Sequence, residues 1–323
     1  MNTKVCDINA ASPPTLDHVV GQRRAVRQLK TAIEALVNDR AVAHADDDPT
    51  MPHLLFVGPP GVGKTLLANI VARELAVKLH EELAQNLVAT GHMHGFMLLA
   101  EPQDILFLDE IHELMPAAQT ILYRALEEGR LFLPSGVNGE RQVLDLPSLT
   151  FVGATTDEWA LTKPLRDRFR IVIRLEHYSD EELAELIAQR ARRLDWSVTD
   201  AAVRAIAVRG RGTPRLALRL LEATRRTARA EASDNMTLDH VRRMAEIEGV
   251  DQLGLDPLEQ RYLQVLKQSQ GPVRLNILAT KLGLPRQTIE RIIESDLIRL
   301  GLIAKEDSGR VLTADGRRHV SRS

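Results

Sequence analysis

The stretch GPPGVGKT at residues 58–65 decides the fold of this chain. It fits the pattern G-x-x-x-x-G-K-[ST], in which glycines let backbone N–H groups surround phosphate oxygens at the start of a helix. We expect Lys64 to reach the β- and γ-phosphates of ATP and the Thr65 hydroxyl to bind Mg²⁺. A glycine loop that merely turns the chain is the alternative, and the strand-like run before it and the helical pattern after it argue against that.

Short apolar runs alternate with helical patterns in the first half of the chain. HLLFVG (53–58), DILFLDE (104–110) and LTFVGATT (149–156) have the length and continuous apolar character of buried parallel strands. Amphipathic helical patterns cover 64–79 and 117–129. The alternation predicts a doubly wound α/β domain around a parallel sheet.

After residue 178 the strand-like runs stop and helical patterns continue. SDEELAELIAQRARRL (179–194) begins with a serine N-cap and an acidic first turn, as a helix should. A linker at 249–257 leads to three helical patterns and two strand-like runs around Ser308-Gly309, which together predict a winged helix. The expected domains are an α/β nucleotide-binding domain (1–177), a small helical lid (178–249) and a C-terminal winged helix (250–323).

Two carboxylates end the second apolar run, at the edge of the sheet where ligands bind in open α/β folds. Asp109 suits a contact to Mg²⁺ through water, and Glu110 suits a base that polarises the attacking water. An acidic pair after a strand is usually an ordinary surface turn, but this pair follows the phosphate loop by about 45 residues, which favours function. Thr156, at the end of the third run, could orient the same water.

Six motifs together resemble the AAA+ ATPases, and more narrowly the RuvB family of Holliday-junction branch-migration motors. They are VGQ (20–22), GPPGVGKT (58–65), LFLDEIH (106–112), GATT (153–156), PLRDRF (164–169) and GTPR (212–215). The resemblance covers roughly residues 15–320. It implies an ATP hydrolase of DNA recombination and repair that translocates duplex DNA as a ring, a hexamer in the family, with ATP or ADP and Mg²⁺ as cofactors.

The resemblance also assigns roles to single residues. Tyr178 would lie near the adenine, Thr156 would sense the γ-phosphate, and Arg215 would be a second sensor. Arg166 or Arg168, of which we favour Arg168, would act as an arginine finger on a neighbour's ATP. The residues expected to bind nucleotide are Val20, Gly21, Gln22, Gly58, Gly61, Val62, Gly63, Lys64, Thr65, Leu66, Tyr178, Pro214 and Arg215. Those expected to act in hydrolysis are Lys64, Asp109, Glu110, Thr156, Arg166 and Arg168, with Thr65 and Asp109 holding Mg²⁺.

DNA contact is expected from the winged helix, because the whole chain has a net charge of only −2. From residue 251 on, 12 Lys and Arg stand against 9 Asp and Glu, a net charge of +3. Arg286, Gln287 and Arg291 lie on the presumed second helix, which could enter the major groove. The residues on or beside the wing that could meet phosphates are Lys305, Arg310, Arg317 and Arg318. Acidic residues in the wing leave open a protein contact instead.

The segment 131–147 predicts a β-hairpin with Asn138-Gly139 at its turn. In the RuvB family a hairpin here binds the junction-recognising partner RuvA, and a purely structural hairpin is an equal alternative. The stretch 80–98 departs from the family pattern. With the acidic wing, it motivates a second hypothesis: a RuvB-like loader or regulator that works with a protein partner in a mobile-element or defence system. A third is a non-hydrolysing nucleotide switch that binds DNA.

The start of the chain has no apolar segment typical of a signal peptide, and no run of about 18 apolar residues predicts a membrane span. We therefore expect a cytoplasmic protein without a membrane partner.

Overall fold

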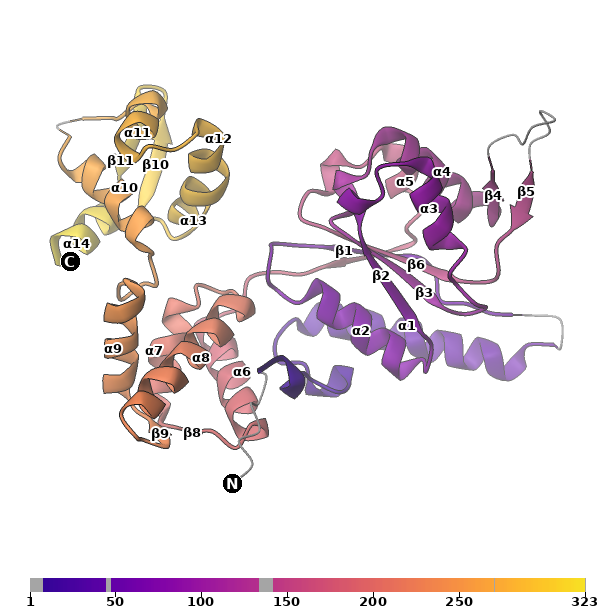
Figure 1. Ribbon diagram of the computed structural model, residues 1–323, viewed down its shortest axis with the longest axis horizontal. Coiled ribbons are helices and arrows are strands. Elements are labelled where there is room, and N and C mark those ends of the chain that lie inside the picture. The colour runs from indigo at the N-terminus through magenta and orange to yellow at the C-terminus, as the bar shows by residue number, and fades with distance from the viewer. Residues whose placement is uncertain (1–7, 45–47, 134–141, 270, 323) are drawn as a thin grey trace. The chain divides into compact units, whose positions relative to one another are not determined.

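The computed structural model describes residues 8–44, 48–133, 142–269 and 271–322 (Figure 1). They form two compact units, one from 1–195 with 212–218 and the other from 196–211 with 219–323. No helix of the described residues is long and apolar enough to cross a membrane.

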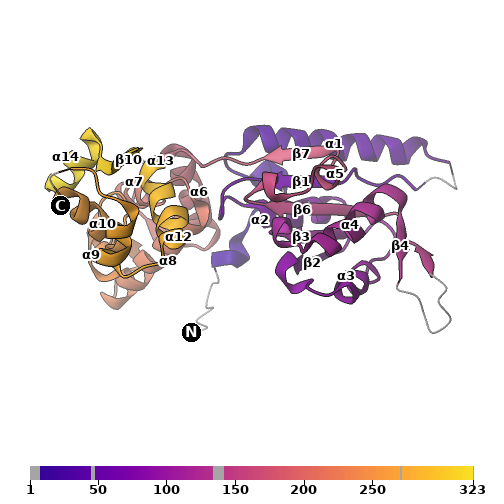
Figure 2. The same ribbon diagram turned by 90° about the horizontal axis from the view of Figure 1, so that it is seen from above.

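A five-stranded parallel sheet, in the order β2-β3-β6-β1-β7, forms the centre of the first unit (Figures 1 and 2). The strands are β1 (Leu54–Val57), β2 (Leu79–Leu83), β3 (Ile105–Asp109), β6 (Thr150–Thr155) and β7 (Ile171–Arg174). The three inner strands β1, β3 and β6 are the three apolar runs predicted from the sequence, and nearly all of their residues are buried. The expected α/β fold is confirmed.

Both edge strands are absent from the prediction, and the helix predicted over 64–79 is too long. That helix ends at Glu74, the chain turns at Ala76 with a φ of 55°, and β2 begins at Leu79. The sequence of β2 is LHEEL and none of its residues is fully buried. An edge strand pairs on one side only, so it can carry charges and lacks the continuous apolar run that marks an inner strand.

Helices cover both faces of the sheet, with α1 and α2 on one side and α3, α4 and α5 on the other (Figure 1). Leu122 of α4 and Leu165 of α5 are fully buried in one apolar cluster with Leu106 and Phe151 of the sheet. The helices of the first unit are α1 (Arg23–Val42), α2 (Lys64–Glu74), α3 (Thr90–Met97), α4 (Pro116–Glu128), α5 (Lys163–Arg166) and α6 (Asp180–Arg193). Short 3-10 turns lie at Ile8–Ala11, Leu16–His18, Ala84–Asn86, Ile111–Glu113 and Glu158–Ala160.

The predicted N-cap of α6 is confirmed in detail. The Ser179 hydroxyl accepts a hydrogen bond from the backbone N–H of Glu182 at 3.2 Å, and the Glu182 carboxylate accepts one from the N–H of Ser179 at 3.0 Å. This reciprocal pair satisfies two N–H groups that the helix leaves unpaired, a contribution of about 1 kcal/mol.

The predicted hairpin is confirmed in its two strands. β4 (Arg130–Phe132) pairs antiparallel with β5 (Val143–Asp145), and Leu131 lies opposite Leu144. The predicted turn at Asn138-Gly139 lies outside the described residues.

The second unit contains the rest of the helical lid and the winged helix. Its lid elements are β8 (Ser197–Val198), α7 (Asp200–Arg209), α8 (Pro214–Ala230, whose first turn belongs to the first unit), β9 (Asn235–Met236) and α9 (Leu238–Glu248). The winged helix comprises α10 (Pro257–Lys267), α11 (Leu275–Leu282), α12 (Arg286–Thr288), α13 (Glu294–Arg299), β10 (Ile303–Glu306), β11 (Gly309–Leu312) and α14 (Ala314–Arg322). A π-helical turn at Ile289–Ile293 joins α12 to α13.

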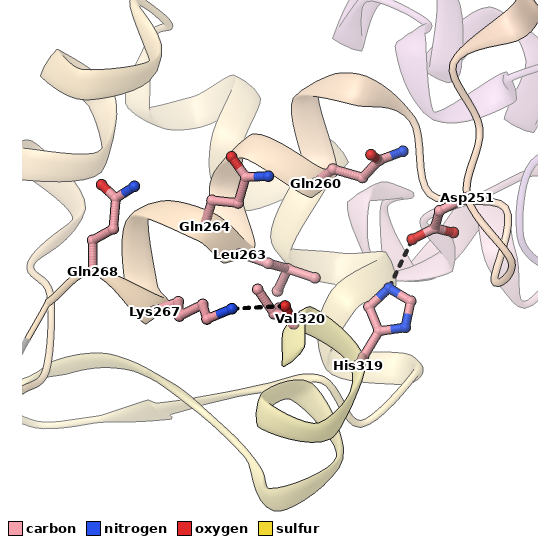
Figure 3. Close-up of a pocket in the computed structure, with 8 residues that line it drawn as sticks. All are labelled: Asp251, Gln260, Leu263, Gln264, Lys267, Gln268, His319 and Val320. Carbon is pink, nitrogen blue, oxygen red and sulfur yellow. Dashed lines mark hydrogen bonds and ion pairs between the residues drawn. The ribbon is translucent and has the colours of Figure 1, made fainter. Parts of the chain in front are cut away.

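The C-terminal helix α14 was not predicted, and it changes the place of two candidate DNA contacts. Arg317 and Arg318 lie on this helix rather than in the wing. Figure 3 shows how α14 is fixed within the unit: His319 Nε2 lies 2.7 Å from a carboxylate oxygen of Asp251 in the linker, and Lys267 Nζ donates to the carbonyl of Val320 at 2.9 Å.

Candidate nucleotide site

The phosphate loop joins the end of β1 to the start of α2. Gly61 and Gly63 have positive φ values of 77° and 108°, which glycine adopts without strain. A Cβ on Gly61 would lie 2.9 Å from a Thr213 methyl, whereas a Cβ on Gly63 would meet no atom within 4 Å. The loop is therefore packed on one side and open on the other. At the N-terminus of an eleven-residue helix, such an opening gives phosphate oxygens access to backbone N–H groups.

Lys64 lies inside this loop. Its side chain is buried, and Nζ donates hydrogen bonds to the carbonyl oxygens of Gly58 at 2.8 Å and Pro59 at 3.1 Å. Burial lowers the pKa of the Lys64 ammonium, and the nearby carboxylates of Glu110 and Asp109 oppose that shift. The sequence-predicted lysine and acidic pair are thus brought together at the end of the sheet.

Thr65 and Asp109 form the second part of the site. The Thr65 hydroxyl lies 3.4 Å from Asp109 Oδ2, and Asp109 Oδ1 accepts a hydrogen bond from the N–H of Glu110 at 3.0 Å. Among the described residues there is no group of three or more His, Cys, Asp and Glu that could hold a metal by itself. A hydroxyl and one carboxylate beside a phosphate loop fit Mg²⁺, which takes its remaining ligands from phosphates and water.

Glu110 is held by two neighbours, one of which the sequence did not indicate. Its backbone is left-handed, with a φ of 48°. The Thr156 hydroxyl donates to Glu110 Oε2 at 3.3 Å, and His112 Nδ1 lies 3.3 Å from the same oxygen and 3.0 Å from the Thr155 hydroxyl. A 3-10 turn follows β3, and it brings the His112 side chain close to Glu110 and Thr155. The only sequence signal for His112 is its position in the DEIH motif.

The residues expected near the base come together from distant parts of the first unit. Gly21 has a φ of 69°, and a Cβ there would lie 2.8 Å from the Tyr178 ring. Gln22 makes two hydrogen bonds to the backbone of Glu176, at 2.7 and 3.2 Å. Burial raises the pKa of Tyr178 to about 12, with Glu182 adding to the shift and a hydrogen bond from Gln22 opposing it.

The GTPR motif lies directly against the phosphate loop. The backbone N–H of Tyr178 donates to the carbonyl of Gly212 at 2.9 Å, and that of Arg215 donates to the carbonyl of Gly61 at 3.3 Å. The Arg215 side chain is exposed at this point, and its charge contributes to lowering the pKa of Lys64. The structure therefore places a second cation beside the loop. Of the other predicted residues, Val20, Val62 and Pro214 are buried, and Leu66 is half-buried.

The two candidate arginine fingers lie at the end of α5 (Arg166) and two residues beyond it (Arg168), and their side chains have different contacts. Arg166 stacks on Trp159, with its Cζ 4.6 Å from the ring centre, and Trp159 is 76% exposed. Arg168 donates to the Tyr123 hydroxyl at 3.3 Å and pairs with the Glu127 carboxylate. The partner of Arg166 lies in the 3-10 turn after β6, and both partners of Arg168 lie on α4.

Four of the candidate DNA residues bond to other residues of the winged helix, and three of these four, Lys305, Arg317 and Arg318, are nevertheless exposed. Arg286, Gln287 and Arg291 are exposed on the helix that follows the turn at Pro285. Arg310 and Lys305, predicted to meet phosphates, instead bond the carboxylate of Glu294, at 2.9 and 2.8 Å. On α14, Arg317 donates to the carbonyl of Leu312 at 2.7 Å, and Arg318 pairs with Asp315.

Glu294 is fully buried and is the centre of an ionic cluster in the winged helix. Besides the two cations, its carboxylate accepts a hydrogen bond from the Tyr262 hydroxyl at 3.0 Å. Burial alone would raise the pKa of the Glu294 carboxyl, but the hydrogen bonds from Arg310, Lys305 and Tyr262 outweigh it and lower the pKa. The ionised carboxylate of Glu294 therefore fixes the wing to α13.

We expect Glu294→Gln to destabilise the winged helix by about 3 kcal/mol at pH 7, because two cations lose a buried partner. A carboxyl whose pKa is lowered by folding contributes stability above its unfolded pKa and loses it as the pH falls through the folded pKa. Wild-type stability should therefore fall towards that of the variant in acid. Hydrogen exchange of α10 and α13 in the full chain measures this, with exposed Glu306→Gln as control. Equal protection in both variants at pH 7 would contradict the expectation.

Comparisons with known proteins find relatives that match nearly the whole chain. Three domain-family models match: the Holliday junction DNA helicase RuvB P-loop domain over residues 11–175, the RuvB AAA lid domain over 178–251 and the RuvB C-terminal winged helix domain over 252–321. The Holliday junction branch migration complex subunit RuvB of Anaeromyxobacter sp. (strain Fw109-5) is 39% identical over 314 residues, which are 96% of this chain and 90% of that protein. The solved Thermotoga maritima RuvB Holliday junction branch migration motor has a TM-score of 0.82 and 34% identity, with 96% of this chain and 98% of that chain covered.

Proposed function

Because this chain belongs to the RuvB family of P-loop AAA+ ATPases, we propose that it hydrolyses ATP in a ring of identical subunits to move duplex DNA at a Holliday junction. It is an ATP-driven branch-migration motor, and none of the similarities favours a loader or regulator. One observation carries the assignment of its site: Lys64, Thr65, Asp109, Glu110 and Thr156 converge at the phosphate loop, linked by the contacts described above.

We assign each of these groups a step in hydrolysis. Lys64 binds the β- and γ-phosphates, and backbone N–H groups of the loop hold the remaining oxygens. Glu110 orients and polarises the attacking water, with Thr156 and His112 fixing the direction of its carboxylate. Thr65 and Asp109 would hold Mg²⁺, whose charge would stabilise the negative charge of the phosphates. Gly21, Gln22 and Tyr178 border the place for the base.

Two arginines complete the site in this proposal. Arg215 reaches the phosphates from the first turn of α8, where its backbone is already bonded to the loop. Arg168 acts on the ATP of a neighbouring subunit and stabilises the charge that develops on the transferred phosphoryl group. An arginine that works across a boundary requires an oligomer in which each subunit completes the next, which supports a ring, six-membered as in the family.

The remaining assignments concern DNA and a partner protein. The winged helix, within residues 250–323, contacts duplex DNA through Arg286, Gln287 and Arg291 rather than through its internally bonded wing. The β4–β5 pair presents Val143 and Leu144, which are 47% and 39% exposed, to a RuvA-like partner. Apolar side chains exposed on a short strand pair suit a protein contact better than a nucleic-acid backbone. The α/β domain over 1–177 and the lid over 178–249 carry the nucleotide.

Steady-state ATP turnover, measured while duplex and four-way-junction DNA are titrated, tests the proposal. We expect junction DNA to raise the turnover number several-fold, because a DNA motor couples hydrolysis to its track. Glu110→Gln should bind ATP without turnover and is the inactive control. Replacing both Arg286 and Arg291 by alanine should remove the stimulation and leave basal turnover intact. Turnover indifferent to every DNA would contradict a DNA motor.

A further inference from the structure

Two side chains of α4 hold the guanidinium of Arg168. Its Cζ lies 5.3 Å from the centre of the Tyr123 ring, and Nη2 donates to the Tyr123 hydroxyl at 3.3 Å. Nε is ion-paired with the Glu127 carboxylate. Tyr123 and Glu127 are four residues apart, so they lie on one face of the helix. Tyr123 contacts the guanidinium through its ring and its hydroxyl, and Glu127 contacts it through a carboxylate oxygen at Nε.

The backbone on both sides of Arg168 rests on the same helix. Leu165 and Phe169 are buried in the apolar cluster that also contains Leu122 and Ala125 of α4. The backbone N–H of Arg168 donates to the carbonyl of Leu165 at 3.2 Å. Main chain and side chain of the arginine are therefore both placed relative to α4.

The last turn of α4 is itself fixed. Gly129 ends the helix with a φ of 64°, and its N–H donates to the carbonyl of Ala125 at 3.1 Å. The Gly129 carbonyl accepts a hydrogen bond from the N–H of Leu146 at 2.8 Å, and Leu131 is completely buried. Glu127 thus stands on a rigid element, which is what precise placement of another side chain requires.

Arg166 lacks a comparable setting. Its contact is with Trp159, an exposed ring that can attract a cation but offers no charged oxygen to set the plane of the guanidinium. The arrangement around Arg168 depends on the planar guanidinium, which offers Nε to the Glu127 carboxylate and Nη2 to the Tyr123 hydroxyl. Two nitrogens of the guanidinium are thereby held by side chains of α4, which sets its plane relative to that helix.

We propose that Glu127 and Tyr123 are positioning residues for Arg168, which set the plane of its guanidinium before it meets the ATP of a neighbouring subunit. The inference rests on the in-trans role proposed above for Arg168. Orientation before reaction lowers the barrier of the chemical step without strengthening the binding of the substrate. The contacts of Arg168 with the Glu127 carboxylate and with the Tyr123 ring therefore contribute to catalysis by the assembly. Neither Glu127 nor Tyr123 touches the nucleotide.

Glu127→Gln in the full chain tests the proposal, with the adjacent exposed Glu128→Gln as matched control. We expect kcat for ATP to fall by about ten- to a hundredfold, with KM and the affinity for a fluorescent ATP analogue unchanged. Tyr123→Phe keeps the ring and removes only the hydroxyl, so it should lower kcat by a smaller factor. Thermal unfolding and sedimentation of each variant establish that fold and assembly are retained. A rise in kcat for Glu127→Gln would mean that the carboxylate withholds the arginine, and would overturn the inference.

A double-mutant cycle with Arg168→Lys separates positioning from other roles of Glu127. Lysine has no planar fork, so adding Glu127→Gln to Arg168→Lys should cause no further loss of kcat. Losses that multiply would show that Glu127 acts elsewhere and would overturn the inference. If Arg168→Lys instead kept wild-type turnover, the proposed in-trans role of Arg168 would itself be wrong. If Arg168→Lys lost turnover while Glu127→Gln stayed fully active, the positioning role of Glu127 would be wrong and the in-trans role of Arg168 would stand.

Discussion

Arg168→Ala lowers the turnover number of the assembled protein by about three orders of magnitude or more, as expected when an arginine finger is removed. The guanidinium stabilises charge that appears only in the transition state, so the affinity for ATP should hardly change. A coupled ATPase assay with saturating junction DNA measures the loss. Arg170→Ala, an exposed arginine two residues away, is the matched control and should retain turnover.

Mixing variants shows whether Arg168 acts across a subunit boundary. Arg168→Ala keeps an intact phosphate loop, and Lys64→Ala keeps an intact arginine. Randomly mixed in equal amounts, the two inactive variants should form about one competent interface in four and recover part of the turnover accordingly. Recovery that never rises above the separate variants would contradict action in trans, and with it the ring.

Lys64→Ala should abolish both ATP turnover and DNA movement, with kcat lowered by at least about a hundredfold. Lys64 Nζ already lies within 3.1 Å of two loop carbonyls, so its charge is at the place where phosphate oxygens would bind. Its removal should also weaken ATP binding, unlike Glu110→Gln, which should lower kcat and leave binding intact. Equilibrium binding of a fluorescent ATP analogue, turnover and branch migration distinguish the two variants. Lys78→Ala, an exposed lysine beyond the end of α2, is the control. Branch migration that continues in Lys64→Ala would refute the scheme.

The centre of the fold could be predicted from the sequence because its physics is local. Inner strands such as β3 and β6 are buried on both faces and therefore consist of continuous apolar runs. The phosphate loop, the capped start of α6 and the end of α4 at Gly129 likewise depend on residue types at fixed spacing. These parts of the prediction are confirmed.

What escaped prediction depends on partners distant in the sequence. β2 is a strand only because β3 lies beside it; its own sequence, LHEEL, carries no strong signal. His112 acquires a place in the site through Thr155, 43 residues away. The sequence predicts Arg310 as a surface cation of the wing, whereas in the folded chain Arg310 pairs with the fully buried Glu294. Sequence pattern reveals the charge of a side chain but not which opposite charge it meets.

The ionic cluster around Glu294 determines how strongly DNA binding should depend on ionic strength. Each phosphate that a lysine or arginine neutralises releases counterions and adds about −0.9 to the slope of log K against log salt. Lys305 and Arg310 are engaged with Glu294, whereas Arg286 and Arg291 are exposed. DNA contact through these two arginines, as proposed above, should give each subunit a slope of only about −2. In the proposed ring, several such subunits on one duplex would multiply their weak individual affinities through high effective concentration. A single subunit of that ring would then detach and rebind quickly while the assembly remains on its track.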